Sequence, residues 1–341
     1  MADDRRRDRE AQIATFLAAH GWADAARRVL AGDASFRRYD RLEAADGRRA
    51  VLMDAPPPED VRPWIAVDRL LGGLGYSVPK IFAADEAAGL LLIEDLGDDT
   101  YTRLLARGAD EHRLYTLAVD LLIDLHRRFS PAIDPGLPRF DDSRALREVG
   151  LLLDWYWPAT QEAPLPEEAR EAYFAAWRAV LPLRHRVADS FAFFDFHVDN
   201  LLWLPEREGV AACGLLDFQD AVLAPQPFDL MSLVEDARRD VAPDLAAELR
   251  ARYLTGFPDL DPEDFAVAFA VVGAQRHSRI LGTFTRLLVR DGKSGYLIHM
   301  PRVWRQLEGN LAHPVLAPVR AWFEAHLPLA ARRLPEPPAG R

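Results

Sequence analysis

The sequence predicts an α+β protein with a small β-rich N-terminal lobe, residues 1–96, and a larger, mainly helical C-terminal lobe, residues 97–341. Two observations support this prediction. In the first part, short hydrophobic runs are bounded by Gly, Asp or Pro, and after residue 97 hydrophobic residues recur at helical spacing. The bounded runs that favour strands are 36–43, 48–53 and 90–94.

Helical spacing places further elements in order along the chain. It predicts a starting helix or helix pair over residues 11–30 and one crossing helix over 59–74. Between Leu114 and Phe129 the leucines line one face, and basic residues follow near the end, where cations suit the helix dipole. Later helices are expected over 166–181, 227–240, 244–255, 262–289 and 315–332.

The helical pattern is interrupted around residues 191–220. The run at Phe191 predicts a buried strand that leads into a loop, residues 201–204 its return, and residues 211–216 a further strand that ends in a carboxylate. A short hairpin would gather polar side chains at one end. Those side chains are Asp195, Asn200 and Asp217.

Composition excludes several kinds of partner. The 341 residues include 42 Lys and Arg against 53 Asp and Glu, a net charge of −11, so no basic field attracts nucleic acid or an anionic membrane. The charged first ten residues lack the apolar core of a secretory signal, and no run reaches the length of a membrane span. We therefore expect a cytoplasmic enzyme. Cys213, the single cysteine, lies in an apolar run and is expected to be buried.

The three polar residues of the interrupted region match the needs of phosphoryl transfer. That reaction requires a group that orients the attacking hydroxyl and oxygen ligands that hold magnesium against the phosphates. A base Asp, an Asn five residues later and an Asp at a strand end occur in this order in kinase-like enzymes. Asp195 is thus the candidate base, and Asn200 and Asp217 are the candidate Mg²⁺ ligands.

Other chemistries are less consistent with the pattern. Asp195, His197 and Asp199 could form a mixed transition-metal site, although the Asn and the strand-end Asp suit magnesium better. No Gly-x-Ser-x-Gly sequence is present, so a hydrolase of that type lacks its nucleophile.

On these residues the chain resembles the aminoglycoside phosphotransferase and choline kinase superfamily. The family motif is His-x-Asp-x-x-x-x-Asn followed by a strand that ends in Asp-Phe or Asp-Trp, and this sequence matches at Asp195, Asn200 and Asp217-Phe218. The later Pro-Gln-Pro-Phe-Asp229-Leu is similar to the family's helix start, whose Asp braces the catalytic loop. The resemblance implies a bilobal protein-kinase-like fold and the use of ATP and Mg²⁺.

Within the superfamily, the sequence is more similar to the bacterial anomeric kinases of cell-wall recycling. These enzymes phosphorylate the C1 hydroxyl of N-acetylmuramate and N-acetylglucosamine, which implies an amino-sugar substrate and a place in peptidoglycan recycling. The segments that carry this similarity are 30–39, 52–56, 195–203, 216–220, 233–240 and 275–277.

The sequence departs from the family pattern at two places. Phe193 stands where the motif has His, with Phe194 where an Arg is common, and the strand that ends at Met53 lacks the lysine that pairs with nucleotide phosphates. An arginine after the turn at residues 32–35 could grip the phosphates instead. The nucleotide-binding candidates are Ser35, Phe36, Arg37 and Arg38, with Glu94 and Leu96 near adenine through their backbone groups.

Two clusters of polar residues in the C-terminal lobe are candidates for the sugar pocket. Carboxylates accept hydrogen bonds from hydroxyls, and an arginine could bind the lactyl carboxylate of muramate. The alternative is a solvated helix face with weak ion pairs at 235–240. The substrate-binding candidates are His197, Glu235, Asp236, Arg238, Arg239, Arg276, His277 and Arg279.

Two other functions stay open at this point. One is a kinase of the same superfamily that acts on an amino alcohol, homoserine or an aminoglycoside. The other is an inactive nucleotide-binding regulator, suggested by Phe193 and the missing lysine. The sequence leaves the oligomeric state undetermined.

Overall fold

The computed structural model describes residues 2–32 and 37–336. Contacts among the residues divide the chain into two compact units. The boundary between lobes expected at residues 96 and 97 stays a prediction. Unit 1 comprises residues 1–117, 133–135 and 198–220, and unit 2 comprises residues 118–132, 136–197 and 221–341.

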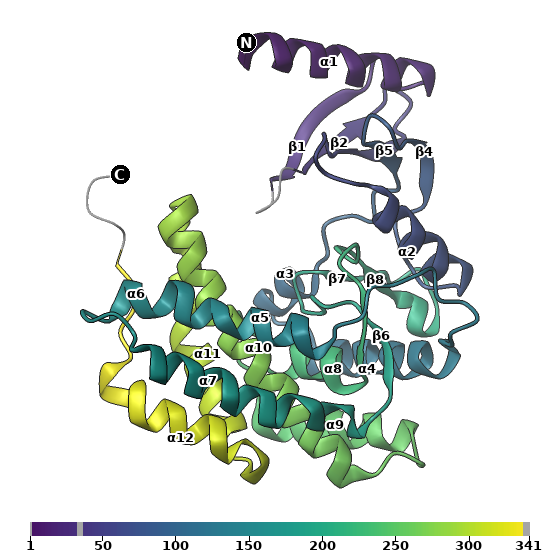
Figure 1. Ribbon diagram of the computed structural model, residues 1–341. Coiled ribbons are helices and arrows are strands. Elements are labelled where there is room, and N and C mark those ends of the chain that lie inside the picture. The colour runs from purple at the N-terminus through teal and green to yellow at the C-terminus, as the bar shows by residue number, and fades with distance from the viewer. Residues whose placement is uncertain (1, 33–36, 337–341) are drawn as a thin grey trace. The chain divides into compact units, whose positions relative to one another are not determined.

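A five-stranded antiparallel sheet forms the centre of unit 1 (Figure 1). Its strands follow one another in space as β1-β2-β3-β5-β4. The strands predicted at 36–43, 48–53 and 90–94 are confirmed. The bounds are β1 Ala26–Gly32, β2 Arg38–Glu43, β3 Arg49–Asp54, β4 Ile81–Asp85 and β5 Leu90–Ile93.

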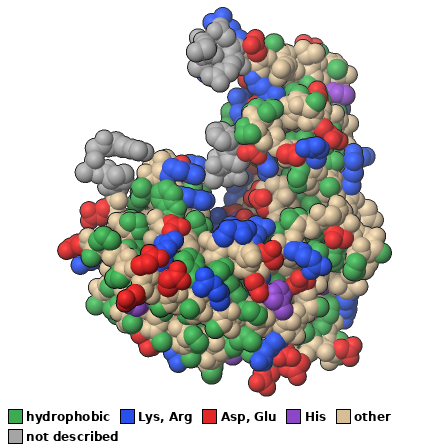
Figure 2. Space-filling view, in the orientation of Figure 1, with side chains coloured by type: hydrophobic (Ala, Val, Ile, Leu, Met, Phe, Trp, Pro, Cys, Tyr) green, Lys and Arg blue, Asp and Glu red, His purple; other side chains and the backbone are tan. Residues whose placement is uncertain are grey.

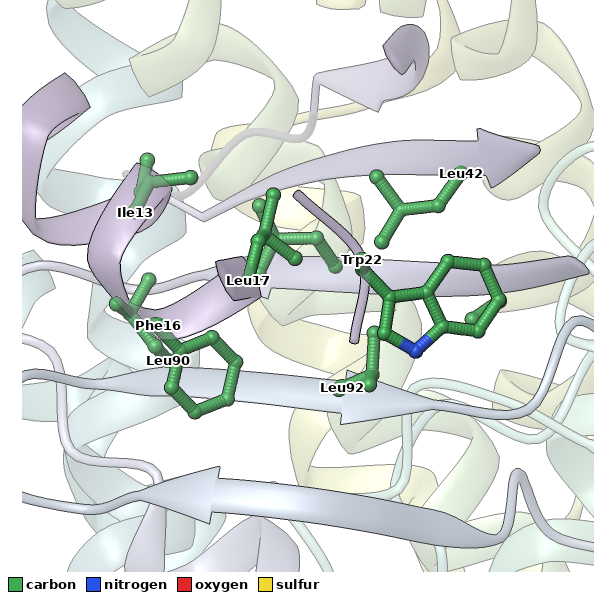
Figure 3. Packing of buried hydrophobic residues seen from close by; sticks show 9 residues of the cluster. Ile13, Phe16, Leu17, Trp22, Leu42, Leu90 and Leu92 are labelled. Atoms are coloured by element: carbon green, nitrogen blue, oxygen red, sulfur yellow. The ribbon is translucent and has the colours of Figure 1, made fainter. Parts of the chain in front are cut away.

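Helix α1 (Ala2–Ala19) packs its apolar face on this sheet. Figure 3 shows Ile13, Phe16 and Leu17 of the helix beside Leu42, Leu90 and Leu92 of the strands. These side chains are almost completely removed from water, which stabilises the unit through the hydrophobic effect.

The helix predicted over residues 11–30 is wrong beyond residue 19. Gly21 takes a left-handed backbone with φ of 77°, which ends the helical segment. Residues 26–32 then pair with β2 as an edge strand instead of continuing the helix. Tertiary pairing therefore overrides the local spacing here.

Unit 1 also contains helix α2 (Arg62–Gly73), as predicted, the short helix α3 (Tyr101–Ala106) and the hairpin of β7 (Leu201–Trp203) and β8 (Cys213–Leu215). The hairpin is tied to earlier parts of the unit by backbone hydrogen bonds. The N–H of Leu215 donates to Ser77 at 2.8 Å, and the N–H of Trp203 donates to Asp99 at 2.9 Å. Cys213 is buried in β8, as expected.

In unit 2, β6 (Asp189–Ala192) pairs with β9 (Val222–Pro225). The prediction that residues 201–204 form the return of this strand is therefore wrong. Both β6 and β9 are short and largely buried, so each satisfies the other's backbone groups inside unit 2, while β7 pairs with β8.

Helices make up most of unit 2, and α10 (Pro262–Asp291) is buried along most of its length. It packs against α5, α8 and α11. The predicted helices over 166–181, 244–255 and 262–289 are confirmed. The bounds are α5 Asp142–Leu151, α6 Trp157–Thr160, α7 Glu167–Val180, α8 Pro227–Val234, α9 Pro243–Gly256, α11 Met300–Leu311 and α12 Ala317–His326. Helix α4 (Glu111–Arg128) begins in unit 1 and continues in unit 2 from residue 118.

Two predicted helices are too long. Helix α8 ends at Val234 and not at residue 240, because the carboxylate of Asp236 accepts the backbone N–H of Arg238 and closes a turn instead. Helix α12 ends at His326 and not at residue 332, because Leu327 precedes a proline, which disfavours helical backbone, and its φ of −133° and ψ of 55° lie outside the helical region.

Charged side chains of both signs are interspersed over the face of the molecule shown in Figure 2. Among the described helices, none combines the length and the apolar character needed to cross a membrane.

The β4–β5 turn supplies a test of the sheet in unit 1. A Cβ at Gly89 would lie 2.0 Å from the carbonyl oxygen of Ala55, and φ is 65°. Gly89→Ala should lower the free energy of unfolding by about 2–5 kcal/mol, because strain and overpacking add. Gly47→Ala is the matched control, with φ of 84° but open space, and should cost about 1–2 kcal/mol. Equal urea midpoints for the two variants would contradict the packing at Gly89.

Candidate active site

The loop that carries Asp195 is held by a buried carboxylate of unit 2. Asp229, in the first turn of α8, accepts the backbone N–H of Phe193 at 2.6 Å and that of Phe194 at 3.2 Å. Burial raises the pKa of Asp229 to about 7, while these two hydrogen bonds oppose the rise. Asp229 thus fixes the backbone immediately before Asp195.

The backbone of Phe194 is strained, and its ring is contacted by another aromatic ring and by two guanidinium groups. Its φ of 75° lies in the left-handed region, which is unfavourable for a bulky residue. The ring stacks on Phe228, with centroids 5.3 Å apart and planes within 12°. The guanidinium groups of Arg279 and Arg144 lie 4.3 Å and 4.7 Å from the ring centre. These contacts stabilise the strained residue through aromatic stacking and cation–π attraction.

Asp195 lies among cations. The guanidinium of Arg276, whose side chain is only 6% exposed, is 3.5 Å from its carboxylate and also donates to the carbonyl of Phe194 at 3.1 Å. Burial acts to raise the pKa of Asp195, but Arg276 and then Arg279, His197 and Arg238 outweigh it and hold the pKa below its ordinary value. Asp195 is therefore ionised at neutral pH and can accept a hydrogen bond.

Two other predicted sugar ligands, His277 and Glu235, are linked through Asn310 within unit 2. His277 is completely buried, and its Nδ1 lies 2.8 Å from the Oδ1 of Asn310, whose amide donates to Glu235 at 3.0 Å. Burial lowers the pKa of His277 to about 4 and raises that of Glu235 to about 7. The geometry is that of an internal network, and the sugar contact of both residues stays a prediction.

The remaining substrate candidates differ in exposure. Asp236 is buried and closes the turn after α8, while Arg238 and Arg239 are half-buried in that turn. Arg279 is 21% exposed and lies 3.6 Å from Glu148. The four candidates whose charges act on Asp195 are Arg276, Arg279, His197 and Arg238.

The candidate metal ligands come together in unit 1 through the β7–β8 hairpin. Asn200 precedes β7 and Asp217 follows β8, and the N–H of Leu216 donates to the carbonyl of Asn200 at 2.9 Å. The amide of Asn200 lies 3.5 Å from Asp217, whose other oxygen accepts from Gln219 at 2.7 Å. The predicted pair is thus adjacent in the fold.

This pair fits magnesium. An amide and a carboxylate supply hard oxygen donors, and Mg²⁺ takes its other ligands from water and phosphate. The alternative of a transition-metal site finds no support, because no group of three His, Cys, Asp or Glu that could hold a metal occurs in residues 2–32 and 37–336. The carboxylate of Asp199 instead accepts the hydroxyl of Thr102.

The nucleotide-binding candidates are placed in part. Ser35 and Phe36 lie outside the described residues. Arg37 pairs with Glu59 at 3.1 Å, and Arg38 grips the buried Asp40 with two hydrogen bonds, so both cations already have carboxylate partners. Their role toward phosphate stays a prediction.

At the end of β5, the N–H of Glu94 donates to Lys80 at 2.9 Å. A nucleotide base would therefore have to use the carbonyl of Glu94 and the N–H of Leu96, and this contact also stays a prediction.

A model of the phosphotransferase enzyme family matches residues 26–266, which is more than half of the chain. The chain belongs to this family. The matched range contains Asp195, Asn200, Asp217 and Asp229, the residues from which the loop and the metal pair are built.

Relatives match over almost the whole length. An N-acetylmuramate/N-acetylglucosamine kinase from Caulobacter vibrioides is 38% identical, over 96% of this chain and 99% of the relative. A protein of the same name from Pseudomonas aeruginosa is 36% identical, over 93% and 96%.

Solved structures support the kinase-like fold. Choline kinase LicA from Streptococcus pneumoniae has a TM-score of 0.59 at 13% identity, over 88% of this chain and 99% of that one. The ADP-bound aminoglycoside phosphotransferase APH(2'')-Ib has a TM-score of 0.56 at 14% identity, over 86% and 96%. The fold expected from the sequence is confirmed.

Sequence reasoning missed several residues of the site. Gln219 directly follows the Asp217-Phe218 motif, and its proximity in sequence was a usable signal. Thr102 and Arg144 are far from the motif in sequence, and nothing in the pattern marks them.

Arg276 should set the acid limb of the pH profile. Arg276→Gln removes the cation that lowers the pKa of Asp195 most, so this pKa should rise. The fall of kcat/KM on the acid side of the pH profile should therefore occur at higher pH. Arg276→Lys keeps the charge and should move it less. Arg290→Gln, an exposed pair with Asp291 on the same helix, is the control. A profile unchanged in Arg276→Gln would refute the pairing.

Asp229→Asn should lower kcat more than it lowers the stability of the fold. Asn offers one acceptor oxygen, so one of the two backbone N–H groups loses its partner at a cost of about 1–3 kcal/mol. Displacement of Asp195 should lower kcat by about 100-fold. Steady-state kinetics and thermal unfolding on the same preparation test this. Wild-type kcat in a folded Asp229→Asn variant would count against a positioning role.

Proposed function

We propose that the protein transfers the γ-phosphoryl group of ATP to the anomeric C1 hydroxyl of N-acetylmuramate and N-acetylglucosamine, in peptidoglycan recycling. The observation that carries the proposal is identity of 36–38% to kinases so named over nearly the full length of both chains. Since ATP is the phosphoryl donor, we place the reaction in the cytoplasm.

The charges around Asp195 favour an acidic substrate over a cationic one. The arginines that act on this carboxylate are Arg276, Arg279 and Arg238, and the last two are partly open to solvent. An arginine can bind the lactyl carboxylate of N-acetylmuramate. The same cations would repel choline, an amino alcohol or an aminoglycoside.

In this proposal Asp195 orients the C1 hydroxyl and accepts its proton as the oxygen attacks the γ-phosphorus in line. An anomeric hydroxyl is more acidic than an ordinary alcohol, so an Asp with a lowered pKa suffices as acceptor. Strong proton abstraction is not required.

Asn200 and Asp217 hold magnesium in this proposal. When bound, Mg²⁺ would neutralise phosphate charge and keep the leaving group oriented. Gln219, which donates to Asp217, leaves the other carboxylate oxygen facing the amide of Asn200.

Phe193 does not argue for an inactive regulator. A family His at this place would brace the loop by a hydrogen bond. Here the ring of Phe193 is held by packing instead: it stacks on Phe196 with centroids 5.1 Å apart and contacts the ring of Phe191 at 4.8 Å. The missing lysine leaves the phosphate-binding cation to be identified. Arg37 and Arg38 stay our candidates.

Asp195→Asn tests the catalytic assignment. With ATP, Mg²⁺ and N-acetylmuramate, kcat should fall by about 1,000-fold or more, because the amide cannot accept the proton, while the KM for ATP should change little. Asp189→Asn, a partly exposed carboxylate on β6, is the matched control and should retain wild-type kcat. Unchanged ATP turnover in Asp195→Asn would overturn the assignment.

The product of the wild-type reaction tests the substrate. Phosphorus NMR should place the new phosphate on C1 of N-acetylmuramate and N-acetylglucosamine. Faster turnover of choline, homoserine or an aminoglycoside, or phosphate on another hydroxyl, would replace the proposed substrate while leaving the kinase assignment intact.

A further inference from the structure

Unit 1 contains a cavity of about 540 Å³ on the side of α2. Helix α2 contributes Asp68, Arg69 and Gly73 to its lining, and Lys80, Glu94 and Arg207 come from later parts of the same unit. Neither Asn200 nor Asp217 lines it. Its volume is in the range of sites for small molecules.

Asp68 is the unusual residue of this cavity. Its side chain is buried, at 6% exposure, yet its Oδ2 makes no hydrogen bond to any residue that the structure describes. Buried polar atoms nearly always have a partner, and an unpaired carboxylate is costly to bury. Burial raises the pKa of Asp68 to about 7, with Arg69 opposing and Glu94 adding to the rise. Because this oxygen has almost no accessible surface, a donor from a bound molecule would remove the cost once the carboxylate turns toward the cavity.

On one side of the cavity, the charges of Glu94 and Arg207 neutralise each other. Glu94 accepts the guanidinium of Arg207 at 2.9 Å and the backbone N–H of Lys80 at 3.2 Å. This pair is internally satisfied, so it shapes the wall without requiring a charged ligand.

Two cations of the cavity stay available. Lys80 and Arg69 are exposed, and neither side chain makes a salt bridge to another residue in the described ranges. Their ammonium and guanidinium groups are donors that suit a carboxylate or a phosphate. The cavity thus combines a buried carboxylate oxygen that lacks a donor with two exposed cations, of which Arg69 also acts electrostatically on Asp68.

We propose that this cavity is a second small-molecule site, distinct from the catalytic residues, that binds a hydroxylated anion such as a sugar carboxylate or a sugar phosphate. Asp68 accepts a hydroxyl or amide of the ligand, and Lys80 and Arg69 bind its anionic group. The proposal does not depend on the substrate assigned above.

A tag at Gly73 reports on this cavity alone. A Cβ there meets nothing within 4 Å, so Gly73→Cys is sterically tolerated. The native Cys213 is completely buried and its thiol pKa is raised to about 12, so a thiol reagent leaves it unmodified. A trifluoroethyl group on the thiol that Gly73→Cys introduces gives a single fluorine NMR signal next to the lining residues.

The tagged full-length protein is titrated with glucose 1-phosphate and with glucuronate, and separately with glucose and inorganic phosphate. We expect a saturable fluorine shift with at least one of the two hydroxylated anions. Asp68→Ala and Lys80→Ala should each weaken that binding about tenfold or more. Arg62→Ala, at a 72% exposed arginine of α2 outside the cavity, should leave it unchanged.

The outcomes separate the alternatives. Which of the two anions binds more tightly distinguishes a sugar phosphate from a sugar acid. If neither anion gives a saturable fluorine shift, the site is overturned. The site is also overturned if the anion binds the Asp68→Ala and Lys80→Ala proteins as tightly as the parent tagged protein. Equally tight binding of glucose or of inorganic phosphate overturns the ligand class. If Asp68→Ala does not fold, Lys80→Ala decides, because Lys80 is exposed and its truncation leaves the core intact.

Discussion

The loop that carries Asp195 depends on one buried carboxylate that accepts two consecutive backbone N–H groups. Asp229 is 1% exposed, and it accepts the backbone N–H of Phe193 at 2.6 Å and that of Phe194 at 3.2 Å, which fixes both peptide planes. Because Asp195 follows directly, the backbone at its position is fixed by hydrogen bonds of the two preceding residues. The cost of burying Asp229 is offset only while both donors are in place, so the loop geometry and the helix start at α8 stabilise each other.

Two phenylalanines stabilise the loop before Asp195 by packing. Phe193, at the place of the family's histidine, stacks on Phe196 and contacts Phe191. Phe194 has Phe228 on one side and guanidinium groups near its ring, while Arg276 binds its carbonyl oxygen. The arginines serve two purposes. Those near the ring stabilise the strained backbone, and Arg276 and Arg279 also lower the pKa of Asp195 against the effect of burial. Replacement of a polar brace by phenylalanine is therefore compatible with an ionised base.

The sequence predicted what local patterns encode. Strands bounded by turn residues, amphipathic helices and the spacing of Asn200 to Asp217 depend on neighbours in the chain, and those predictions agree with the fold. The failures involve tertiary partners. Residues 26–30 continue a helical spacing but pair with β2, and β6 selects β9 across a long segment instead of β7. The contact of Arg276 with Asp195 likewise joins residues whose adjacency no local pattern contains.

Backbone strain gives an independent reason to regard these residues as functional. In the described ranges, the non-glycine residues with positive φ are Phe194 and Asp217. Glycine would remove the strain at either position, so each side chain has to contribute more than the strain costs. At Asp217 the contribution is a carboxylate that no glycine can supply beside Asn200. At Phe194 it is a ring whose contacts hold the loop before Asp195. Both strained positions are thus ones at which glycine would relieve the strain but would remove a side chain with specific contacts.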